Sequence, residues 1–419
     1  MRVTILALGS RGDVQPHANL GAGLRRAGHQ VRLATFEGFR NMAQAGGLEF
    51  HPIRGDAREM VLGSGGRGAL SSGRNILRLW NGILRSFGQL RQTLPSDLNQ
   101  MPWADTDVLI NQLPGALYGY DLAERFPIRL YRAATMPLAR TRVFPMLAFP
   151  KALSGLPGYN ALTYRLAEQI VWSGFGPSID RWRTASLKLR RWGWGGHYRK
   201  MEAARVPTLV GISPHVVARP ADWADHIHMT GYWYPPEGRP QDEELIRFVE
   251  SGPPPVFLGF GSMPVSDPAR ATQLLLEAIR LTGRRAVLHA GWAGLGGTEL
   301  PDHVYPVGET EYSWLFPRTC AIVHHGGSGT TSFALRSGVP AVIVPFVFDQ
   351  FYWGERVATL GVGPRAIPYR RLTASGLAEA IEVAAGDSAM RSRAESLAQR
   401  MRADAGVSGT IKILESGMR

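Results

Sequence analysis

The chain has 419 residues, of which 44% are hydrophobic and 19% are charged. This composition excludes a disordered chain, and the length is enough for two or three domains. The net charge of +13 favours an acidic partner, either nucleic acid or an anionic membrane surface and phosphorylated ligands. Because no zinc-finger, RNP-type or helix-turn-helix pattern accompanies the basic residues, we expect no nucleic-acid binding.

Cys320 is the single cysteine, which excludes a disulfide framework and a cysteine-based zinc site. One free thiol fits a reducing compartment, so we expect a cytoplasmic protein. The apolar run at residues 3–8 is too short for a signal peptide, and no run approaches the ~20 apolar residues that span a bilayer. We therefore expect a protein that is soluble or bound peripherally to a membrane.

The first half of the chain predicts a parallel sheet. A strand at 3–8, a glycine-containing loop, a helix at 14–27 and a strand at 30–35 form a βαβ unit. Further apolar runs predict buried strands at 107–113, 128–134 and 208–212. The segments 57–102 and 136–206 interrupt the alternation, and we interpret them as helical or loop insertions that line an acceptor site.

A proline-rich stretch at 232–240 precedes a second α/β series. Strands are expected at 255–260, 285–289, 321–324 and 341–345, and helices at 269–281, 329–337 and 390–414. The predicted fold class is α/β, with two Rossmann-like, doubly wound parallel-sheet domains facing a cleft. The predicted domains are residues 1–234 and 235–400, with a C-terminal helix at 401–419 that packs back on the first.

The strongest candidate for a ligand-binding loop leaves the strand at 321–324 and enters a helix. It reads His324-His325-Gly326-Gly327-Ser328-Gly329-Thr330-Thr331. Glycines let the backbone approach a ligand, the N–H groups of a helix start face a phosphate, and Ser328 and Thr330 add hydroxyl donors. No lysine follows as in a P-loop, so this loop predicts a seat for a diphosphate without Walker chemistry. The alternative is a glycine-rich turn without a ligand.

Two further loops carry polar side chains. Asp349 and Gln350 follow the next strand and can bind the hydroxyls of a hexose, although such a pair ahead of a helix is also an ordinary cap. Asp13, in Gly9-Ser10-Arg11-Gly12-Asp13, is expected just before a helix, as a cap or as a general base with a raised pKa. His17, one turn further along, is the alternative base or a partner of Asp13.

Two other patterns are weaker. The first loop has Gln15 where a third glycine of a dinucleotide fingerprint would stand, so a dehydrogenase fits poorly, although Glu37 could imitate the ribose-binding acid. Asp105-Thr106-Asp107 could hold a divalent metal, but it stands directly before a strand and is better explained as a solvated lead-in. We predict no metal site.

The loops as a set resemble family 1 glycosyltransferases of GT-B fold, most closely the sterol glucosyltransferase group. The resemblance lies in GSRGDVQP (9–16), GFGSMP (259–264), and the segments 219–233, 314–345 and 349–362. It implies Asp13 as the catalytic base and an inverting single displacement without metal or cofactor, with UDP-glucose as the donor. The donor-binding residues that it implies are Ser10, Arg11, Gly12, Gly261, Ser262, His325, Gly327, Ser328, Gly329, Thr330, Asp349 and Gln350.

Departures from the family pattern leave the donor open. Glu311-Tyr312-Ser313-Trp314 stands where relatives often have Pro-His-Asp-Trp, so TDP-sugars stay possible, and Phe348 and Phe351 flank the Asp-Gln pair and can narrow the sugar pocket. The expected partners are a nucleotide-sugar donor and a lipophilic acceptor. The alternatives are a non-catalytic sugar-nucleotide-binding protein and a sugar-nucleotide epimerase.

The segment 181–200 contains seven Lys or Arg, no acidic residue and the tryptophans Trp182, Trp192 and Trp194. Basic residues with aromatic neighbours suit an anionic bilayer surface, which would allow a peripheral membrane contact. A basic helix with its tryptophans packed inward explains the pattern equally well.

Overall fold

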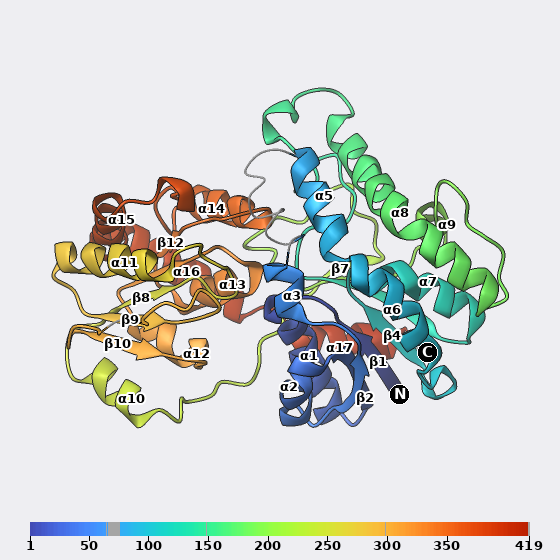
Figure 1. Ribbon diagram of the computed structural model, residues 1–419, viewed down its shortest axis with the longest axis horizontal. Coiled ribbons are helices and arrows are strands. Elements are labelled where there is room, and N and C mark those ends of the chain that lie inside the picture. The colour runs from blue at the N-terminus through green and yellow to red at the C-terminus, as the bar shows by residue number, and fades with distance from the viewer. Residues whose placement is uncertain (64, 66–75, 148, 298, 418–419) are drawn as a thin grey trace. The chain divides into compact units, whose positions relative to one another are not determined.

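The computed structural model describes residues 1–63, 65, 76–147, 149–297 and 299–417. The chain forms two compact units, shown in Figure 1. Unit 1 comprises Met1–Pro235 and Asp404–Arg419, and unit 2 comprises Pro236–Ala403. The chain therefore leaves unit 1 after Pro235 and returns to it at Asp404.

Unit 1 is built on a seven-stranded sheet in the order β3-β2-β1-β4-β5-β6-β7, with every neighbouring pair parallel. The strands are β1 (Arg2–Leu6), β2 (Gln30–Phe36), β3 (Glu49–Ile53), β4 (Val108–Asn111), β5 (Arg129–Ala134), β6 (Thr208–Val210) and β7 (Ile227–Met229). The α-helices are α1 (Arg11–Arg26), α2 (Arg40–Ala45), α3 (Ala57–Leu62), α5 (Ile76–Ser86), α6 (Gly88–Asn99), α7 (Ala116–Arg125), α8 (Tyr159–Ala185), α9 (Tyr198–Ala203) and α17 (Gly406–Ser416). Short 3-10 turns are η1 (Glu37–Phe39), η2 (Trp103–Asp105) and η3 (Lys151–Leu153).

Unit 2 has a five-stranded parallel sheet in the order β10-β9-β8-β11-β12. Its strands are β8 (Val256–Gly259), β9 (Ala286–His289), β10 (Val304–Val307), β11 (Ala321–His324) and β12 (Ala341–Ile343). Its helices are α10 (Glu243–Glu250), α11 (Pro268–Thr282), α12 (Tyr312–Leu315), η4 (Phe316–Arg318), α13 (Ser328–Ser337), α14 (Asp349–Thr359), η5 (Tyr369–Arg371), α15 (Ala374–Gly386) and α16 (Ser388–Arg402). The predicted α/β class with two doubly wound parallel sheets is confirmed.

The strand order fixes where a ligand can bind in each unit. It reverses between β1 and β4 in unit 1, and between β8 and β11 in unit 2. In open parallel sheets the crevice at the carboxyl ends of such a strand pair is the usual ligand site. The loops that follow β1 and β4, and those that follow β8 and β11, are therefore the ones to examine.

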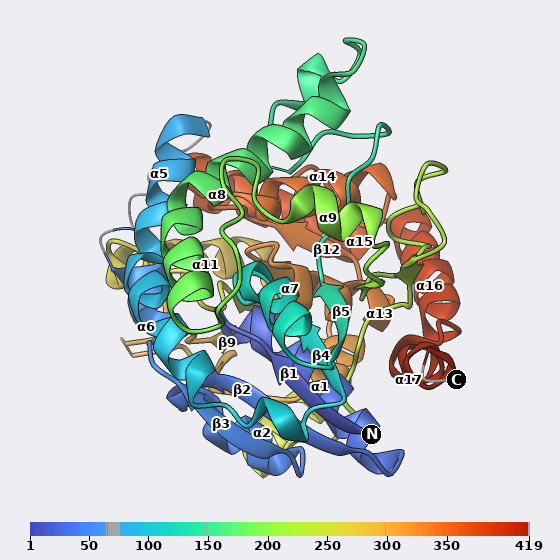
Figure 2. The same ribbon diagram turned by 90° about the vertical axis from the view of Figure 1, so that its right-hand side faces the viewer.

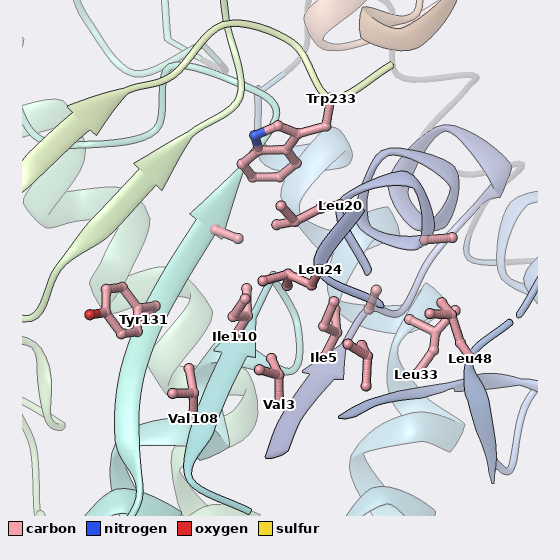
Figure 3. Packing of buried hydrophobic residues seen from close by; sticks show 14 of the residues in the cluster. Val3, Ile5, Leu20, Leu24, Leu33, Leu48, Val108, Ile110, Tyr131 and Trp233 are labelled. Carbon is pink, nitrogen blue, oxygen red and sulfur yellow. The ribbon is translucent and has the colours of Figure 1, made fainter. Parts of the chain in front are cut away.

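The hydrophobic core of unit 1 joins the sheet to α1, as Figure 3 shows. Ile5 of β1 and Ile110 of β4 are fully buried in one cluster with Leu24 of α1. Trp233, two residues before the first segment of unit 1 ends at Pro235, belongs to the same cluster.

The C-terminal helix α17 packs against α1. A Cβ on Gly23 would lie 2.2 Å from a methyl carbon of Val407, so the glycine allows close approach of the two helices. The indole Nε1 of Trp233 donates to the hydroxyl of Thr410 at 2.9 Å. The stretch 390–414, which we expected to be helical, forms two helices: α16 ends at Arg402, and α17 begins at Gly406, whose φ of 51° is unfavourable for other residues.

Three strands have no counterpart among the predicted ones. They are β3, β7 and β10, and each lies at the edge of its sheet. An edge strand is partly solvated, so it lacks the continuous apolar run of a central strand. Pro52 in β3 and Pro306 in β10 lower the strand signal further, and both are tolerated because an edge leaves one set of N–H groups unpaired.

The two predicted insertions are largely helical where the structure describes them. The segment 57–102 contains α3, α5 and α6, although its residues 64 and 66–75 lie outside the described residues. The segment 136–206 contains the 27-residue α8, which is the long helix of unit 1 in Figures 1 and 2. Across the described part of the chain, no helix is both long and apolar enough to span a membrane.

Candidate functional site

The loop after β1 folds Asp13 back onto the start of α1. The helix begins at Arg11 with Ser10 as its cap, so Asp13 lies in the first turn and not before the helix as we expected. Its Oδ2 accepts from the backbone N–H of Ser10 at 2.8 Å and from the Ser10 hydroxyl at 2.9 Å. Gly9 has a φ of 137°, and a Cβ there would lie 2.5 Å from Oδ2. Only glycine therefore fits beneath this carboxylate.

Burial raises the pKa of Asp13, and the two bonds from Ser10 offset part of that shift. A raised pKa brings a carboxylate closer to the range in which it can take a proton from a hydroxyl. The second oxygen, Oδ1, lies 3.4 Å from the side-chain nitrogen of Gln112. The Gln112 side-chain oxygen accepts from the backbone N–H of Leu8 at 3.2 Å, which links the loops after β1 and β4.

Gln112 was not among the predicted site residues. It directly follows β4, at the position where the strand order of unit 1 reverses. A polar residue at the end of an apolar run was the available signal, but the run alone does not reveal which strand neighbours β1. The strand order supplies that information.

His17, the alternative base, is fully buried. Its Nδ1 lies 2.7 Å from the backbone oxygen of Asp13, and its ring packs edge-on against Trp233. Burial lowers the pKa of His17 to about 4, so the ring is neutral at pH 7 and Nδ1 donates to the carbonyl. This contact stabilises the first turns of α1 and favours a structural role for His17.

The other residues of this loop lie on the surface of α1 or beside it. Arg11 donates from Nε to the side-chain oxygen of Gln15 at 3.1 Å, and Gly12 is exposed.

Glu37, which follows β2, forms an ion pair with Arg40 at 2.5 Å, which lowers the pKa of Glu37. A carboxylate held in this way at the surface gives no support to a ribose-binding role.

In unit 2, the histidine- and glycine-containing loop joins β11 to α13 at the reversal of strand order. Gly327 is the cap and Ser328, Gly329 and Thr330 form the first turn of α13. The first helical bond runs from the N–H of Thr331 to the oxygen of Gly327 at 2.9 Å. The N–H groups of the first turn therefore lie at the open end of the helix, where an anion is stabilised.

The ring of His325 is held between two glycines. A Cβ on Gly261, in the loop after β8, would lie 2.8 Å from the His325 ring, and a Cβ on Gly327 would lie 2.4 Å from its Nε2. Burial lowers the pKa of His325 to about 4, with a further contribution from nearby His289, so the ring is neutral at pH 7. A neutral imidazole still carries one N–H, which can donate to a phosphate oxygen.

His324 has a different environment. It is fully buried at the end of β11, and its Nδ1 accepts from the N–H of Gly326 at 3.1 Å. Burial lowers its pKa well below the usual value. His324 therefore fixes the backbone of the loop, and His325 is the remaining candidate of the two for a contact with a ligand.

Asp349 and Gln350 begin α14, after β12. The amide of Gln350 is engaged inside the unit: its oxygen accepts from the backbone N–H of Phe346 at 2.8 Å, and one N–H of its nitrogen donates to the sulfur of Met263 at 3.0 Å. Asp349 accepts from the indole N–H of buried Trp353 at 3.1 Å and is only half-buried itself. Asp349 is therefore the more available of the two for a sugar hydroxyl.

Ser262 lies in the loop after β8, next to Gly261, whose φ is 58°. The oxygen of Gly261 accepts from the N–H of Trp292 at 2.9 Å. Met263 in the same loop receives the amide of Gln350. The loops after β8, β11 and β12 thus contact one another within unit 2 through His325 and Gln350.

The Asp105-Thr106-Asp107 motif is engaged by the first strand. Arg2 donates to Asp107 at 2.8 Å and to Asp105 at 3.2 Å, and the hydroxyls of Thr106 and Thr4 lie 2.9 Å apart. Arg2 lowers the pKa of Asp107. The motif therefore ties β1 to the chain before β4. Among the described residues, no group of three His, Cys, Asp or Glu is placed to hold a metal ion.

The segment 181–200 divides between core and surface. Trp182 is buried and donates to Asn99 at 2.8 Å, and Trp192 donates to Asp121 at 2.6 Å. Buried Arg183 pairs with Asp121 at 2.5 Å and lies over the Trp192 ring. Two of the three tryptophans are thus packed inward, and Trp194 alone of the three is exposed, at 85%.

Two family models match the chain. Residues 3–145 match "Glycosyltransferase family 28 N-terminal domain", and residues 281–416 match "Erythromycin biosynthesis protein CIII-like, C-terminal domain". The first match includes the Asp13 loop, and the second includes the loops after β11 and β12. The loop after β8, with Gly261 and Ser262, lies between the two matched segments.

Similar proteins agree with these models. The chain is 35% identical to "Sterol 3-beta-glucosyltransferase" of Yarrowia lipolytica, over 99% of this chain and 28% of that protein. It is also 35% identical to "Sterol 3-beta-glucosyltransferase UGT80B1" of Arabidopsis thaliana, over 91% of this chain and 62% of that protein. The chain thus spans 28% of the length of the first relative and 62% of the second, less than two thirds of either.

A solved structure shows the same fold. Glycosyltransferase SsfS6 of Streptomyces sp. SF2575, complexed with thymidine diphosphate, superposes with a TM-score of 0.65 at 20% identity, over 99% of each chain. The sheet orders and the matched family segments agree with these similarities. The chain has the fold of the GT-B glycosyltransferases and is similar over nearly its whole length to proteins named sterol 3-beta-glucosyltransferases.

Proposed function

We propose that this protein transfers a hexose from a nucleotide diphosphate donor to a hydroxyl of a lipophilic acceptor. The observation that supports this most strongly is the loop between β11 and α13, where neutral His325 stands beside an open helix N-terminus. That combination suits a diphosphate, which is anionic and rich in hydrogen-bond acceptors. The similarity to proteins named sterol 3-beta-glucosyltransferases supports the same conclusion.

In the proposed reaction, unit 2 holds the donor and Asp13 of unit 1 acts as the base. The Asp13 carboxylate takes the proton of the acceptor hydroxyl while the oxygen attacks the anomeric carbon of the sugar. The bond between that carbon and the diphosphate oxygen breaks, so the configuration inverts in a single displacement. The nucleoside diphosphate leaves with its new charge stabilised by the first turn of α13 and by His325.

We propose glucose from UDP-glucose as the donor, and a sterol, another terpenoid or a polyphenol as the acceptor. The names of the relatives support a glucosyl group and a sterol. The complex of SsfS6 with thymidine diphosphate keeps a TDP-sugar as the alternative. Asp349 is the residue proposed to bind sugar hydroxyls, since the amide of Gln350 is occupied by Phe346 and Met263.

The proposed reaction uses neither a metal ion nor a cofactor. The charge that develops on the leaving diphosphate can be offset by the helix dipole, by backbone N–H groups and by a histidine N–H. In other transferases a metal ion stabilises this charge. The carboxylates of Asp105 and Asp107 are held by Arg2 and support a structural role for that motif. We further propose a cytoplasmic protein in peripheral contact with a membrane, where a lipophilic acceptor is concentrated.

The test is a transfer assay with the purified chain, several UDP- and TDP-sugars, and a panel of detergent-solubilised sterols and phenols. We expect a glucoside of inverted configuration, with an unchanged rate in EDTA. Incubation without acceptor separates an epimerase, which would change the sugar of the donor. Tight binding of UDP without transfer to any alcohol would show a sugar-nucleotide-binding protein and refute the proposal.

A further inference from the structure

Exposed apolar side chains are concentrated in one segment of unit 1. Among the described residues, nine large hydrophobic side chains are exposed, and six of them lie between residues 143 and 194. Large exposed apolar patches on a soluble domain usually mark a surface that contacts a partner. We call these six residues the apolar patch: Val143, Leu153, Leu156, Leu162, Leu166 and Trp194.

The patch is assembled on α8 by hydrogen bonds. Leu162 and Leu166 are one helical turn apart on α8, so they share a face. Gln169, three residues further along the same face, donates to the backbone oxygen of Trp194 at 3.1 Å. The loop that carries exposed Trp194 is thereby held against the end of this leucine pair.

The N-terminal end of α8 holds the rest of the patch. The side chain of Asn160 donates to the backbone oxygen of Arg142 at 2.9 Å, which places Val143 beside the first turn of the helix. The Ser154 hydroxyl donates to the side-chain oxygen of Asn160 at 2.9 Å, so the chain that carries Leu153 and Leu156 is anchored at the same turn. The patch is therefore a built surface and not a set of scattered residues.

The charge of the same segment is strongly positive. Residues 142–199 contain nine Lys or Arg and two acidic residues, Glu168 and Asp180. Glu168 is paired with Arg140, and Asp180 accepts from the backbone N–H groups of Trp192 and Gly193. Of the nine basic residues only Arg183 is buried; the exposed ones are Arg142, Lys151, Arg165, Arg181, Lys188, Arg190, Arg191 and Arg199.

Exposed leucines and a tryptophan, carried by a segment rich in exposed basic side chains, match the chemistry of an anionic bilayer surface. Apolar side chains enter the boundary between headgroups and acyl chains, and each Lys or Arg near the surface adds electrostatic attraction. A protein partner would need a surface both acidic and apolar, whereas an anionic membrane offers both properties everywhere. The concentration of charge and exposed apolar area in one segment thus favours lipid.

We propose that the apolar patch on α8 docks this protein onto anionic membranes. The proposal rests on the proposed function for its purpose, since the lipophilic acceptor of that reaction would be found in a membrane. Binding through the patch itself requires neither the donor nor sugar transfer. Of the tryptophan segment 181–200 it keeps Trp194 and the exposed basic residues, but not Trp182 and Trp192, which are packed inward.

The experiment measures co-flotation of the full chain, without donor, with vesicles of phosphatidylcholine alone or with roughly 30% phosphatidylglycerol. We expect binding to the anionic vesicles that weakens as salt is raised, and little binding to the neutral ones. Leu162→Glu combined with Leu166→Glu should weaken binding at least about tenfold. Leu281→Glu is the matched control, because Leu281 of unit 2 is 49% exposed and Leu162 is 51% exposed. It should bind as the wild type does.

Transfer to a detergent-solubilised acceptor is measured on the same variants and should be unchanged in all of them. Vesicle binding by a chain that transfers to no acceptor would leave the docking surface standing and refute only the proposed function. Equal binding to neutral and anionic vesicles, or full binding by the double variant, would overturn the docking proposal. So would loss of transfer to the solubilised acceptor in that variant, which would make the patch an acceptor site. A dimer in ultracentrifugation that the double variant abolishes, without vesicle binding, would make it an interface between copies.

Discussion

Gly327→Ala tests whether His325 must keep its place for the donor to bind. The change adds one methyl group, and the φ of −63° at this position is one that alanine adopts without strain. The new Cβ would lie 2.4 Å from Nε2 of His325. Since an ordinary non-bonded contact is about 3.5 Å, the ring must move by roughly 1 Å.

A shift of that size breaks a hydrogen bond, because N–H···O bonds occupy a narrow range of distance. A bond to a charged phosphate is worth about 1.5–3 kcal/mol, so the Kd for UDP should rise roughly ten- to 150-fold. The free energy of unfolding should fall by only about 1–2 kcal/mol, from overpacking and from alanine at a helix cap. Calorimetric titration with UDP measures the first quantity, and denaturant unfolding measures the second.

The design includes two controls. Gly386→Ala, at the last turn of α15, adds a methyl group with no atom within 4 Å and should leave the Kd unchanged. His325→Ala should weaken UDP binding to a similar extent, and adding Gly327→Ala to it should cost little more, since both act through one ring. A folded Gly327→Ala variant that binds UDP like the wild type, or fully additive losses in the double variant, would refute the assigned role of His325.

Three further predictions concern unit 1. Asp13→Ala should lower the rate of transfer by about 10²–10⁴-fold and leave the Kd for UDP unchanged; wild-type turnover would remove the base assignment. Because the working form of Asp13 is its carboxylate and burial raises its pKa, kcat should fall as the pH is lowered through that raised pKa. Gln112→Leu removes the nitrogen beside this carboxylate and should move the fall to higher pH, whereas an unmoved profile would contradict the contact. Arg183→Met leaves Asp121 buried without its partner and should lower the free energy of unfolding by about 3–5 kcal/mol at pH 7, measured in urea. The loss should shrink as the pH falls toward the pKa of Asp121, which burial raises to about 6, because the unpaired carboxyl of the variant takes up a proton at a higher pH than that of the wild type. A loss independent of pH would argue against the ion pair.

The central strands of both sheets could be predicted because they are buried on both faces. Strands β1, β4, β8 and β11 read as continuous apolar runs, and the loops that follow β1, β8 and β11 carry most of the candidate residues. The helices between these strands were found for the same reason. The edge strands β3, β7 and β10, in contrast, are set by the neighbour with which they pair, which the local sequence does not encode, whereas the edge strand β12 is fully buried and was predicted.

The candidate site was predictable at the level of loops and less so at the level of single side chains. Asp13, His325 and Asp349 stand out in the sequence because they lie in the connections that follow predicted strands. The sequence alone does not show that the amide of Gln350 forms hydrogen bonds with Phe346 and Met263. It also does not show that the side chain of Gln112 reaches the carboxylate of Asp13, because that contact joins segments far apart in the chain. Composition was similarly ambiguous for residues 181–200, where Trp192 stacks on a buried arginine and Trp194 faces solvent.

Both units use one device at the point where their strand order reverses. Gly9 lies beneath the Asp13 carboxylate, and Gly261 and Gly327 lie on either side of the His325 ring, each at a distance that leaves no room for a Cβ. Because glycine has no side chain, a polar side chain can fold back against these loops. Burial there shifts the pKa of that side chain in the direction that favours its neutral form. Such packing costs desolvation in the free protein, but it holds the side chain in one geometry before a ligand arrives. A side chain that only capped a helix would gain nothing from this confinement, which is why the glycines, more than the polar residues themselves, argue for a functional role of the two loops.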